Sequence, residues 1–142
     1  MKHYNKYKGF TLIEILIAVL LVGLAISALM AANGAFTMAN GEGANLSTAE
    51  FLIEQIRELT TTLDYDDIYD LDDSLFSPPI SAASAQLIDL SAYSQQVTVQ
   101  NISQTNFEQV VDDGDSDFVR ITVTVFLDTR QISSASWIRT NY

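Results

Sequence analysis

The chain has 142 residues, enough for one domain of ordinary size. It contains no cysteine, which excludes disulfides, thiolate metal sites and cysteine nucleophiles. The formal net charge is −11, and it is segregated: all three lysines precede residue 10, whereas four arginines and 18 acidic residues give the rest of the chain −14. Such a body repels phosphate, so no nucleic acid partner is expected.

A run of 23 residues, 10–32, is almost entirely apolar. Because about 20 apolar residues span a bilayer as a helix, we predict a hydrophobic transmembrane and assembly helix over residues 10–33. The lysines precede this helix and the acids follow it, so the positive-inside rule predicts a single-pass protein with its N-terminus in the cytoplasm. The alternative is a cleavable secretory signal, whose apolar region would be shorter, about 7–15 residues.

Glu14 is the unusual residue of this run. An ionised carboxylate near the middle of a membrane helix costs about 2.5–3.5 kcal/mol. Near the cytoplasmic end the cost is smaller, so one interpretation is a carboxylate that reaches the lipid headgroups. The other interpretation rests on the preceding residues: a short basic leader ends in Gly9, and Phe10, Thr11 and Glu14 follow in the order "KGFTLIE".

These residues resemble the processing motif of type IV pilin-like proteins, which include major pilins, minor pilins and secretion-system pseudopilins. The resemblance implies that a prepilin peptidase cuts between Gly9 and Phe10, removing the basic leader 1–9, and that Phe10 becomes N-methylated. It also implies assembly through Phe10 and Glu14, in which Glu14 pairs with the Phe10 amine of a neighbouring subunit.

The same resemblance sets the expected partners and location. The partners are the prepilin peptidase, other pilin or pseudopilin subunits, the inner-membrane assembly platform and the lipid bilayer. The expected location is the cytoplasmic (inner) membrane, followed by a pilus or pseudopilus on the periplasmic or extracellular side.

The proposed role of Glu14 is also reasonable on physical grounds. Cleavage would create an ammonium at Phe10, one helical turn before Glu14, and each charge is expensive in apolar surroundings unless it is paired. Removing one partner of a buried pair costs several kcal/mol, about 3–5. The pair therefore disfavours packing of neighbouring helices that are shifted along their axes. We interpret Glu14 as the residue that sets the axial register between subunits.

Residues 34–63 are predicted to form the amphipathic second half of the helix. Gly34, Gly41 and Gly43 each cost a helix about 1 kcal/mol relative to alanine, so both a flexible joint and a plain linker remain open for this stretch. From residue 46 a period of 3.6 residues predicts an apolar face that packs on a sheet, formed by Leu46, Ala49, Leu52, Ile53, Ile56, Leu59 and Leu63.

Residues 64–142 are predicted to form a globular head with acidic loops and an antiparallel sheet. The segment 63–73, with six aspartates, is predicted as an acidic connecting loop, and residues 77–95 connect it to the sheet. Alternation predicts strands in "QQVTVQNIS", in "FVRITVTVFLD" and in a shorter edge segment, "ISSASWIRTNY", while "FEQVV" is expected to pair with the strand that follows it. The predicted core face of the clearest strand is Val119, Ile121, Val123, Val125 and Leu127.

One long helix lying on three or four antiparallel strands is an α+β fold. The resemblance implies the same pilin-like arrangement, a long N-terminal helix packed on a small antiparallel sheet.

A second acidic run, "DDGDSD", offers candidate metal ligands, Asp112, Asp113, Asp115 and Asp117, and the acidic loop 63–73 is a second candidate calcium site. Closely spaced oxygens suit Ca²⁺, which takes about six to eight oxygen ligands, but the spacing is not that of an EF-hand, and a solvated turn is the alternative. No other cofactor is expected. The single histidine, His3, lies in the leader, so we predict no catalytic residues and no enzyme activity.

We therefore predict a structural subunit of a type IV pilus or pseudopilus, and the segment 46–68 is more similar to minor subunits than to abundant ones. One alternative is a pseudopilin of a type II secretion system. The other is a membrane-anchored binding or adhesion module. Its aromatic side chains are displayed, buried as core or in contact with other subunits: Phe51, Tyr65, Tyr69 and Tyr93.

Overall fold

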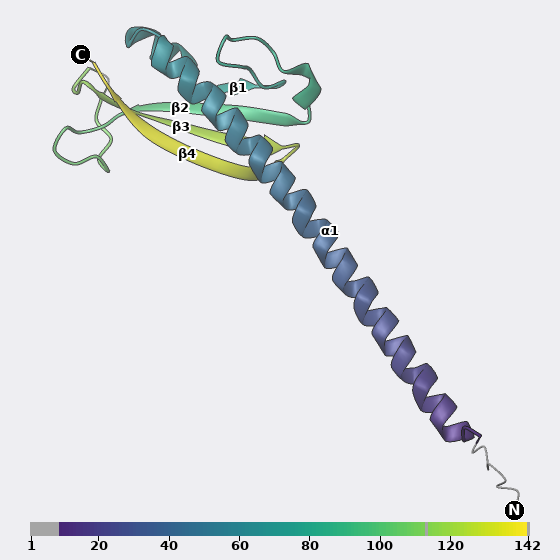
Figure 1. Cartoon of the computed structure of the whole chain (residues 1–142). Helices are drawn as coiled ribbons and strands as arrows, with labels where there is room; N and C mark the ends of the chain where they lie inside the picture. Colours follow the sequence, from purple (N-terminus) through teal and green to yellow (C-terminus); the bar gives the residue numbers. More distant parts are fainter. Residues whose placement is uncertain (1–8, 113, 142) are drawn as a thin grey trace, which may run out of the picture. The chain divides into compact units, whose positions relative to one another are not determined.

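The computed structural model describes residues 9–112 and 114–141 of the chain. Their elements, in chain order, are helix α1 (Leu12–Thr62), 3-10 helix η1 (Asp66–Leu71), strand β1 (Ser74–Phe76), 3-10 helix η2 (Ile88–Leu90) and strands β2 (Tyr93–Asn101), β3 (Phe118–Leu127) and β4 (Arg130–Thr140) (Figure 1). The chain divides into two compact units, Met1–Glu42 and Gly43–Tyr142, and α1 contributes to both.

In the first unit, every described residue is exposed. Helix α1 is the one helix among the described residues that is long and apolar enough to cross a membrane. Ser27 Oγ donates a hydrogen bond to the Gly23 carbonyl at 2.8 Å. The Ser27 hydroxyl therefore carries no unsatisfied donor into the apolar segment.

The backbone is helical throughout residues 33–43, including the three glycines. A Cβ added at Gly34, Gly41 or Gly43 would meet no atom within 4 Å. These glycines are therefore not required by a close contact within the subunit, and their effect on α1 is the low helix propensity of glycine itself.

The second unit is built on a four-stranded antiparallel sheet with strand order β1-β2-β3-β4. Strand β2 pairs with β3 from Tyr93↔Leu127 to Asn101↔Val119, and β4 covers the other edge of β3. Because side chains alternate along a strand, one face of the sheet is apolar. Within this unit α1 lies along that face (Figure 1), and the two surfaces enclose a core that includes Ala49, Leu52, Ile53, Ile56, Leu59, Val97, Val119, Ile121, Val123 and Val125.

The predicted α+β fold is confirmed, as are most of the predicted core positions. The exceptions lie at the ends of elements. Leu46 is 48% exposed and does not join the core, Leu63 is half-buried where α1 has just ended, and Leu127 is half-buried at the last position of β3.

The acidic segment 63–73 is more structured than predicted. Instead of a plain loop, it contains η1, in which Ile68 is fully buried and Tyr69 and Leu71 pack against the core. Strand β1, which the sequence did not indicate, lies between this segment and the expected connection 77–95, and it pairs Leu75 with Gln96. Asp72 Oδ1 accepts a hydrogen bond from the Val99 amide at 2.7 Å, so this carboxylate supports the sheet.

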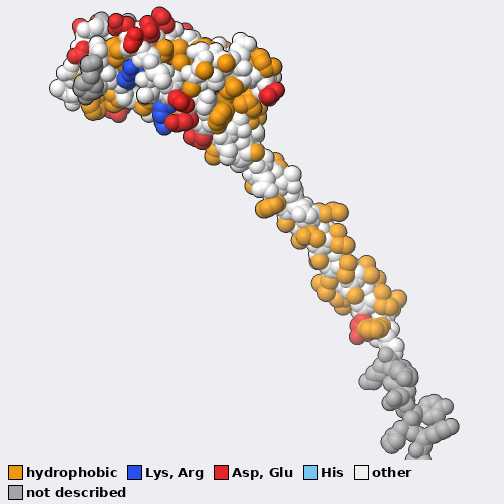
Figure 2. Space-filling view, turned by 45° about the horizontal axis from the view of Figure 1, so that its top comes forward, with side chains coloured by type: hydrophobic (Ala, Val, Ile, Leu, Met, Phe, Trp, Pro, Cys, Tyr) orange, Lys and Arg blue, Asp and Glu red, His pale blue; other side chains and the backbone are white. Residues whose placement is uncertain are grey.

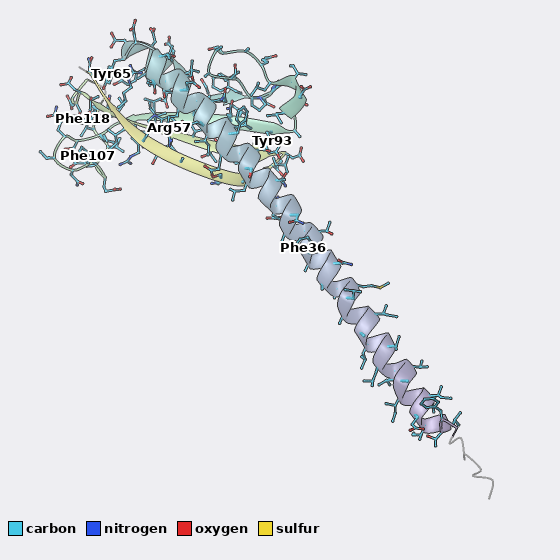
Figure 3. The ribbon with its side chains drawn as sticks, viewed as in Figure 1. Phe36, Arg57, Tyr65, Tyr93, Phe107 and Phe118 are labelled. Carbon is cyan, nitrogen blue, oxygen red and sulfur yellow. The ribbon has the colours of Figure 1, made fainter. Side chains whose placement is uncertain are left out.

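Two further strand predictions were wrong. The segment "FEQVV" does not pair with β3; Val110 instead forms an isolated bridge with Ile102, and the Phe107 ring lies 5.9 Å from that of Phe118 (Figure 3). Strand β4 is an edge strand, as predicted, but its 11 residues make it longer than β3, which has 10. The sequence indicated a shorter strand because many residues of β4 are polar, which weakens the alternation of apolar and polar side chains. An edge strand accommodates these polar residues.

Buried polar side chains attach α1 to the sheet. Gln95 on β2 has no exposed surface. Its Oε1 accepts from the Ile80 amide at 2.7 Å, and its Nε2 donates to the carbonyls of Leu52 (2.8 Å) and Ile80 (3.2 Å). One amide side chain therefore joins β2, α1 and the segment before η2.

Arg139 on β4 holds the end of α1. Its guanidinium donates to the carbonyls of Thr60 and Leu63. The last turn of α1 has no basic residue of its own. Arg139 thus supplies the positive charge that a helix C-terminus favours, and it satisfies carbonyls that lack partners within the helix.

Gln95→Leu should lower the free energy of unfolding by about 1–3 kcal/mol, because it leaves the buried Ile80 amide without an acceptor. Unfolding of the full chain in detergent can be followed through the fluorescence of Trp137, the one tryptophan, which packs against the core. Gln96→Leu is the matched control, since Gln96 is the next residue and lies on the opposite face of β2. Equal destabilisation by both substitutions would contradict this role for Gln95.

Candidate processing and assembly site

The predicted processing residues lie at the start of α1. Gly9, Phe10 and Thr11 have no helical assignment, and the helix begins at Leu12. All are exposed, Phe10 to 85%. The Gly9–Phe10 peptide bond therefore lies in exposed, non-helical backbone, which is where proteases cut most readily. The rest of the predicted leader, 1–8, with its lysines and His3, lies outside the described residues.

Thr11 and Glu14 satisfy each other at this helix start. The Thr11 amide and the Thr11 hydroxyl donate to Glu14 Oε2 at 2.8 Å and 2.9 Å. In return, the Glu14 amide donates to Thr11 Oγ1 at 3.3 Å. This reciprocal arrangement is a capping box, with Thr11 as the N-cap and Glu14 at the third helical position. The negative charge of Glu14 also complements the positive end of the helix dipole.

The capping box gives Glu14 a role within one subunit that the sequence analysis missed. The signal was present, because threonine followed three residues later by glutamate, before an apolar run, is the pattern of a capping box. The two roles are compatible. Both hydrogen bonds use Oε2, and Oε1 accepts none from the described residues. A carboxylate can accept about four hydrogen bonds, so Glu14 keeps capacity for a second partner.

That second partner does not come from the described part of the same chain. Among residues 9–112 and 114–141, no lysine, arginine or histidine forms an ion pair with Glu14. Within the described residues, the charge of Glu14 is therefore compensated only by hydrogen bonds and by the helix dipole.

The structure describes three of the four candidate calcium ligands. Asp112, Asp115 and Asp117 are described, whereas Asp113 lies outside the described residues. No three acidic or histidine side chains gather into a metal-sized group in the part of the chain that the structure describes. Calcium binding stays a prediction, and a melting temperature that millimolar Ca²⁺ leaves unchanged would refute it.

The two acidic segments meet around Tyr65. Asp66 from η1 and Asp117 from the later run line the same hollow as Tyr65 and Tyr69. The Tyr65 hydroxyl is buried and has no hydrogen-bond partner among the described residues. Burial raises the pKa of Tyr65, and nearby Tyr69, Asp117 and Asp66 raise it further, so the hydroxyl stays neutral.

Three of the four aromatic residues considered for an adhesive surface are structural. Tyr65, Tyr69 and Tyr93 are half-buried and pack against the core, and only Phe51 is exposed, to 49%. The Tyr93 hydroxyl donates to Asn45 Oδ1 at 2.8 Å and thereby connects β2 to α1 (Figure 3). The Tyr69 hydroxyl likewise donates to Asn101 Oδ1 at 2.7 Å and connects η1 to β2. The three tyrosines therefore do not form a displayed aromatic surface.

Thr11→Val should weaken the start of α1 by about 1 kcal/mol, the usual loss for a removed N-cap, which corresponds to about fivefold faster local opening. Hydrogen exchange of the full chain in detergent, measured over residues 12–15, tests this. Thr11→Ser keeps the hydroxyl and is the control. Equally slow exchange in the valine and serine variants would show that the capping box is not formed.

A family model described as the prokaryotic N-terminal methylation motif matches residues 4–32. The matched stretch contains Gly9, Phe10, Thr11 and Glu14 and ends within the apolar part of α1. A search of curated proteins and a search of solved structures found no significant match to the chain.

Proposed function

Because the N-terminal methylation motif and the long apolar helix together fit a type IV pilin-like prepilin, we propose that this chain becomes a minor structural subunit of a type IV pilus or pseudopilus. The motif supports a subunit of the pilin or pseudopilin type, and it is a structural motif, not that of an enzyme family. In this proposal the prepilin peptidase cuts after Gly9, Phe10 is N-methylated, and the apolar helices assemble.

The observation that carries the proposal is the state of Glu14. Its Oε2 already holds the start of its own helix, and its Oε1 is open. Cleavage after Gly9 would create an ammonium at Phe10, next to the residue that caps the helix. In assembled subunits the Phe10 ammonium of one copy would bind the open side of Glu14 in its neighbour. Each charge would then have a partner in apolar surroundings.

The surface of α1 in the first unit is suited to membrane insertion followed by assembly with other subunits. Apolar side chains are the most frequent kind along this stretch on the face shown in Figure 2, and none of its described residues is buried within the subunit. Lipid would cover this surface before assembly, and the helices of neighbouring subunits would cover it afterwards. Phe36 and Met38 extend the exposed apolar surface beyond the membrane-length run, with 68% and 75% exposure.

The proposed partners follow from this pathway. They are the prepilin peptidase, the lipid bilayer, the inner-membrane assembly platform and other pilin or pseudopilin subunits. The lysines before the apolar run support a cytoplasmic N-terminus, and in this proposal the head lies on the periplasmic or extracellular side.

Glu14→Ala should leave membrane insertion and cleavage intact but reduce incorporation into filaments about tenfold or more, because an unpaired ammonium in apolar surroundings costs several kcal/mol. Cleavage can be followed by mass, as the loss of residues 1–9 and the gain of one methyl group. Incorporation can be followed by the share of the variant in sheared filaments when it is coexpressed with its assembly machinery.

Ser27→Ala is the matched control, because Ser27 is a polar residue of the same segment whose hydroxyl donates to the Gly23 carbonyl of the same helix. It should assemble normally. Normal incorporation of Glu14→Ala would refute the assignment, whereas an uncleaved precursor would show that Glu14 acts on the peptidase step.

A further inference from the structure

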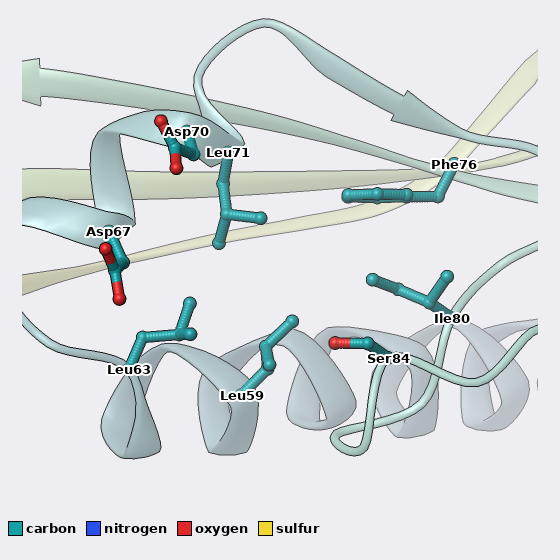
Figure 4. Close-up of a pocket in the computed structure, with 8 residues that line it drawn as sticks. All are labelled: Leu59, Leu63, Asp67, Asp70, Leu71, Phe76, Ile80 and Ser84. Carbon is teal, nitrogen blue, oxygen red and sulfur yellow. The ribbon is translucent and has the colours of Figure 1, made fainter.

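The head contains a cavity of about 450 Å³ that the proposed function does not use (Figure 4). It lies between the end of α1, η1, β1 and the segment that follows β1. Its lining residues are Leu59, Leu63, Asp67, Asp70, Leu71, Phe76, Ile80 and Ser84. All of them belong to the second unit, far along the chain from the processing site.

The floor of this cavity is the hydrophobic core itself. Leu59 and Ile80 are core residues with only 5% and 7% exposure, and Leu71 and Phe76 pack against the same core. Protein interiors are normally close-packed, so an apolar hollow that reaches the core leaves surface for a ligand to cover. The volume also falls in the range of small-molecule sites, roughly 300–1,000 Å³.

The charged side chains that line the cavity are both acidic. Asp67 and Asp70 are three residues apart in η1, so they project from the same side of that 3-10 helix. Both are exposed, and Figure 4 shows them beside Leu63 and Leu71, with Ser84 across the cavity. No arginine from the described part of the chain lines it. The other aspartates of the segment 63–73 add to a negative potential at the mouth.

We propose that this cavity binds a small organic cation. The apolar body of the ligand contacts Leu59, Leu71 and Phe76, and its ammonium group lies beside the carboxylates of Asp67 and Asp70. The carboxylates favour a positive group and repel an anion of the same shape, whereas the apolar walls disfavour a bare, hydrated ion. The ligand class is therefore an aryl- or alkylamine, and the inference does not depend on filament assembly.

The test is a titration of the full chain in lipid nanodiscs, with ¹³C-labelled leucine and isoleucine methyl groups, using 2-phenylethylamine as the probe. The methyl signals of Leu71 and Ile80 should shift and saturate, whereas those of Ile138, outside the cavity, should not move. The anion 3-phenylpropionate, which has the same phenylethyl body, should bind at least about tenfold more weakly, because its charge faces the two carboxylates.

The double variant Asp67→Asn/Asp70→Asn should bind 2-phenylethylamine about threefold more weakly or worse, since each exposed charge pair contributes modestly. Asp89→Asn is the matched control, because Asp89 is an acidic residue of η2 that does not line the cavity. Methyl spectra away from the cavity report whether each variant is folded. Ser84→Phe should abolish binding by filling the space.

The proposal is overturned if the cavity methyls show no saturable shift, if amine and anion bind equally, or if the double variant binds like Asp89→Asn. None of these results bears on filament incorporation, so this inference and the proposed function fail separately.

Discussion

The carboxylate of Glu14 needs hydrogen-bond donors or a counter-charge, because it lies near the start of an apolar helix. An isolated charge in the middle of a membrane helix costs about 2.5–3.5 kcal/mol on insertion scales. Thr11 supplies two donors within the subunit, through its amide and its hydroxyl. These donors bind one carboxylate oxygen and leave the other open. The same residue therefore stabilises the helix of a single subunit and keeps an oxygen for the proposed pair with the N-terminus of a neighbour.

In the second unit, polar side chains determine how α1 lies on the sheet. An apolar stripe alone tolerates sliding, since hydrophobic contacts are not directional. Gln95 binds the Leu52 carbonyl, and Arg139 binds the carbonyls at the end of the helix. These contacts require particular carbonyls at particular places. Together with the core they fix the position and the end of α1 within the head.

Local repeats made much of the fold predictable from the sequence. The 3.6-residue period of α1 and the alternation of β3 identified their buried faces, because each pattern is repeated over several turns or residue pairs. The segment 63–73 has no such repeat. Ile68, Tyr69 and Leu71 are interleaved with six aspartates, and a six-residue 3-10 helix is too short to show a period. Strand β1, with three residues, is equally short.

The candidate site was predictable to a similar extent and for a similar reason. Gly9, Phe10 and Glu14 stand close together in the sequence, so their spacing was visible without a structure. Contacts between distant segments were not. Nothing local indicates that Asp72, among its neighbouring aspartates, accepts from the Val99 amide. The cavity beside η1 was hidden as well, because four separate segments line it.

The central claim is that Glu14 of one subunit contacts the Phe10 amine of another. Solid-state NMR on filaments mixed from two populations, one carrying ¹⁵N-phenylalanine and the other ¹³C-glutamate, measures this contact between subunits directly. We predict dipolar coupling between the Phe10 amine and the Glu14 carboxylate that corresponds to an N···O distance of about 4 Å or less. Absence of that coupling in intact mixed filaments would contradict the account.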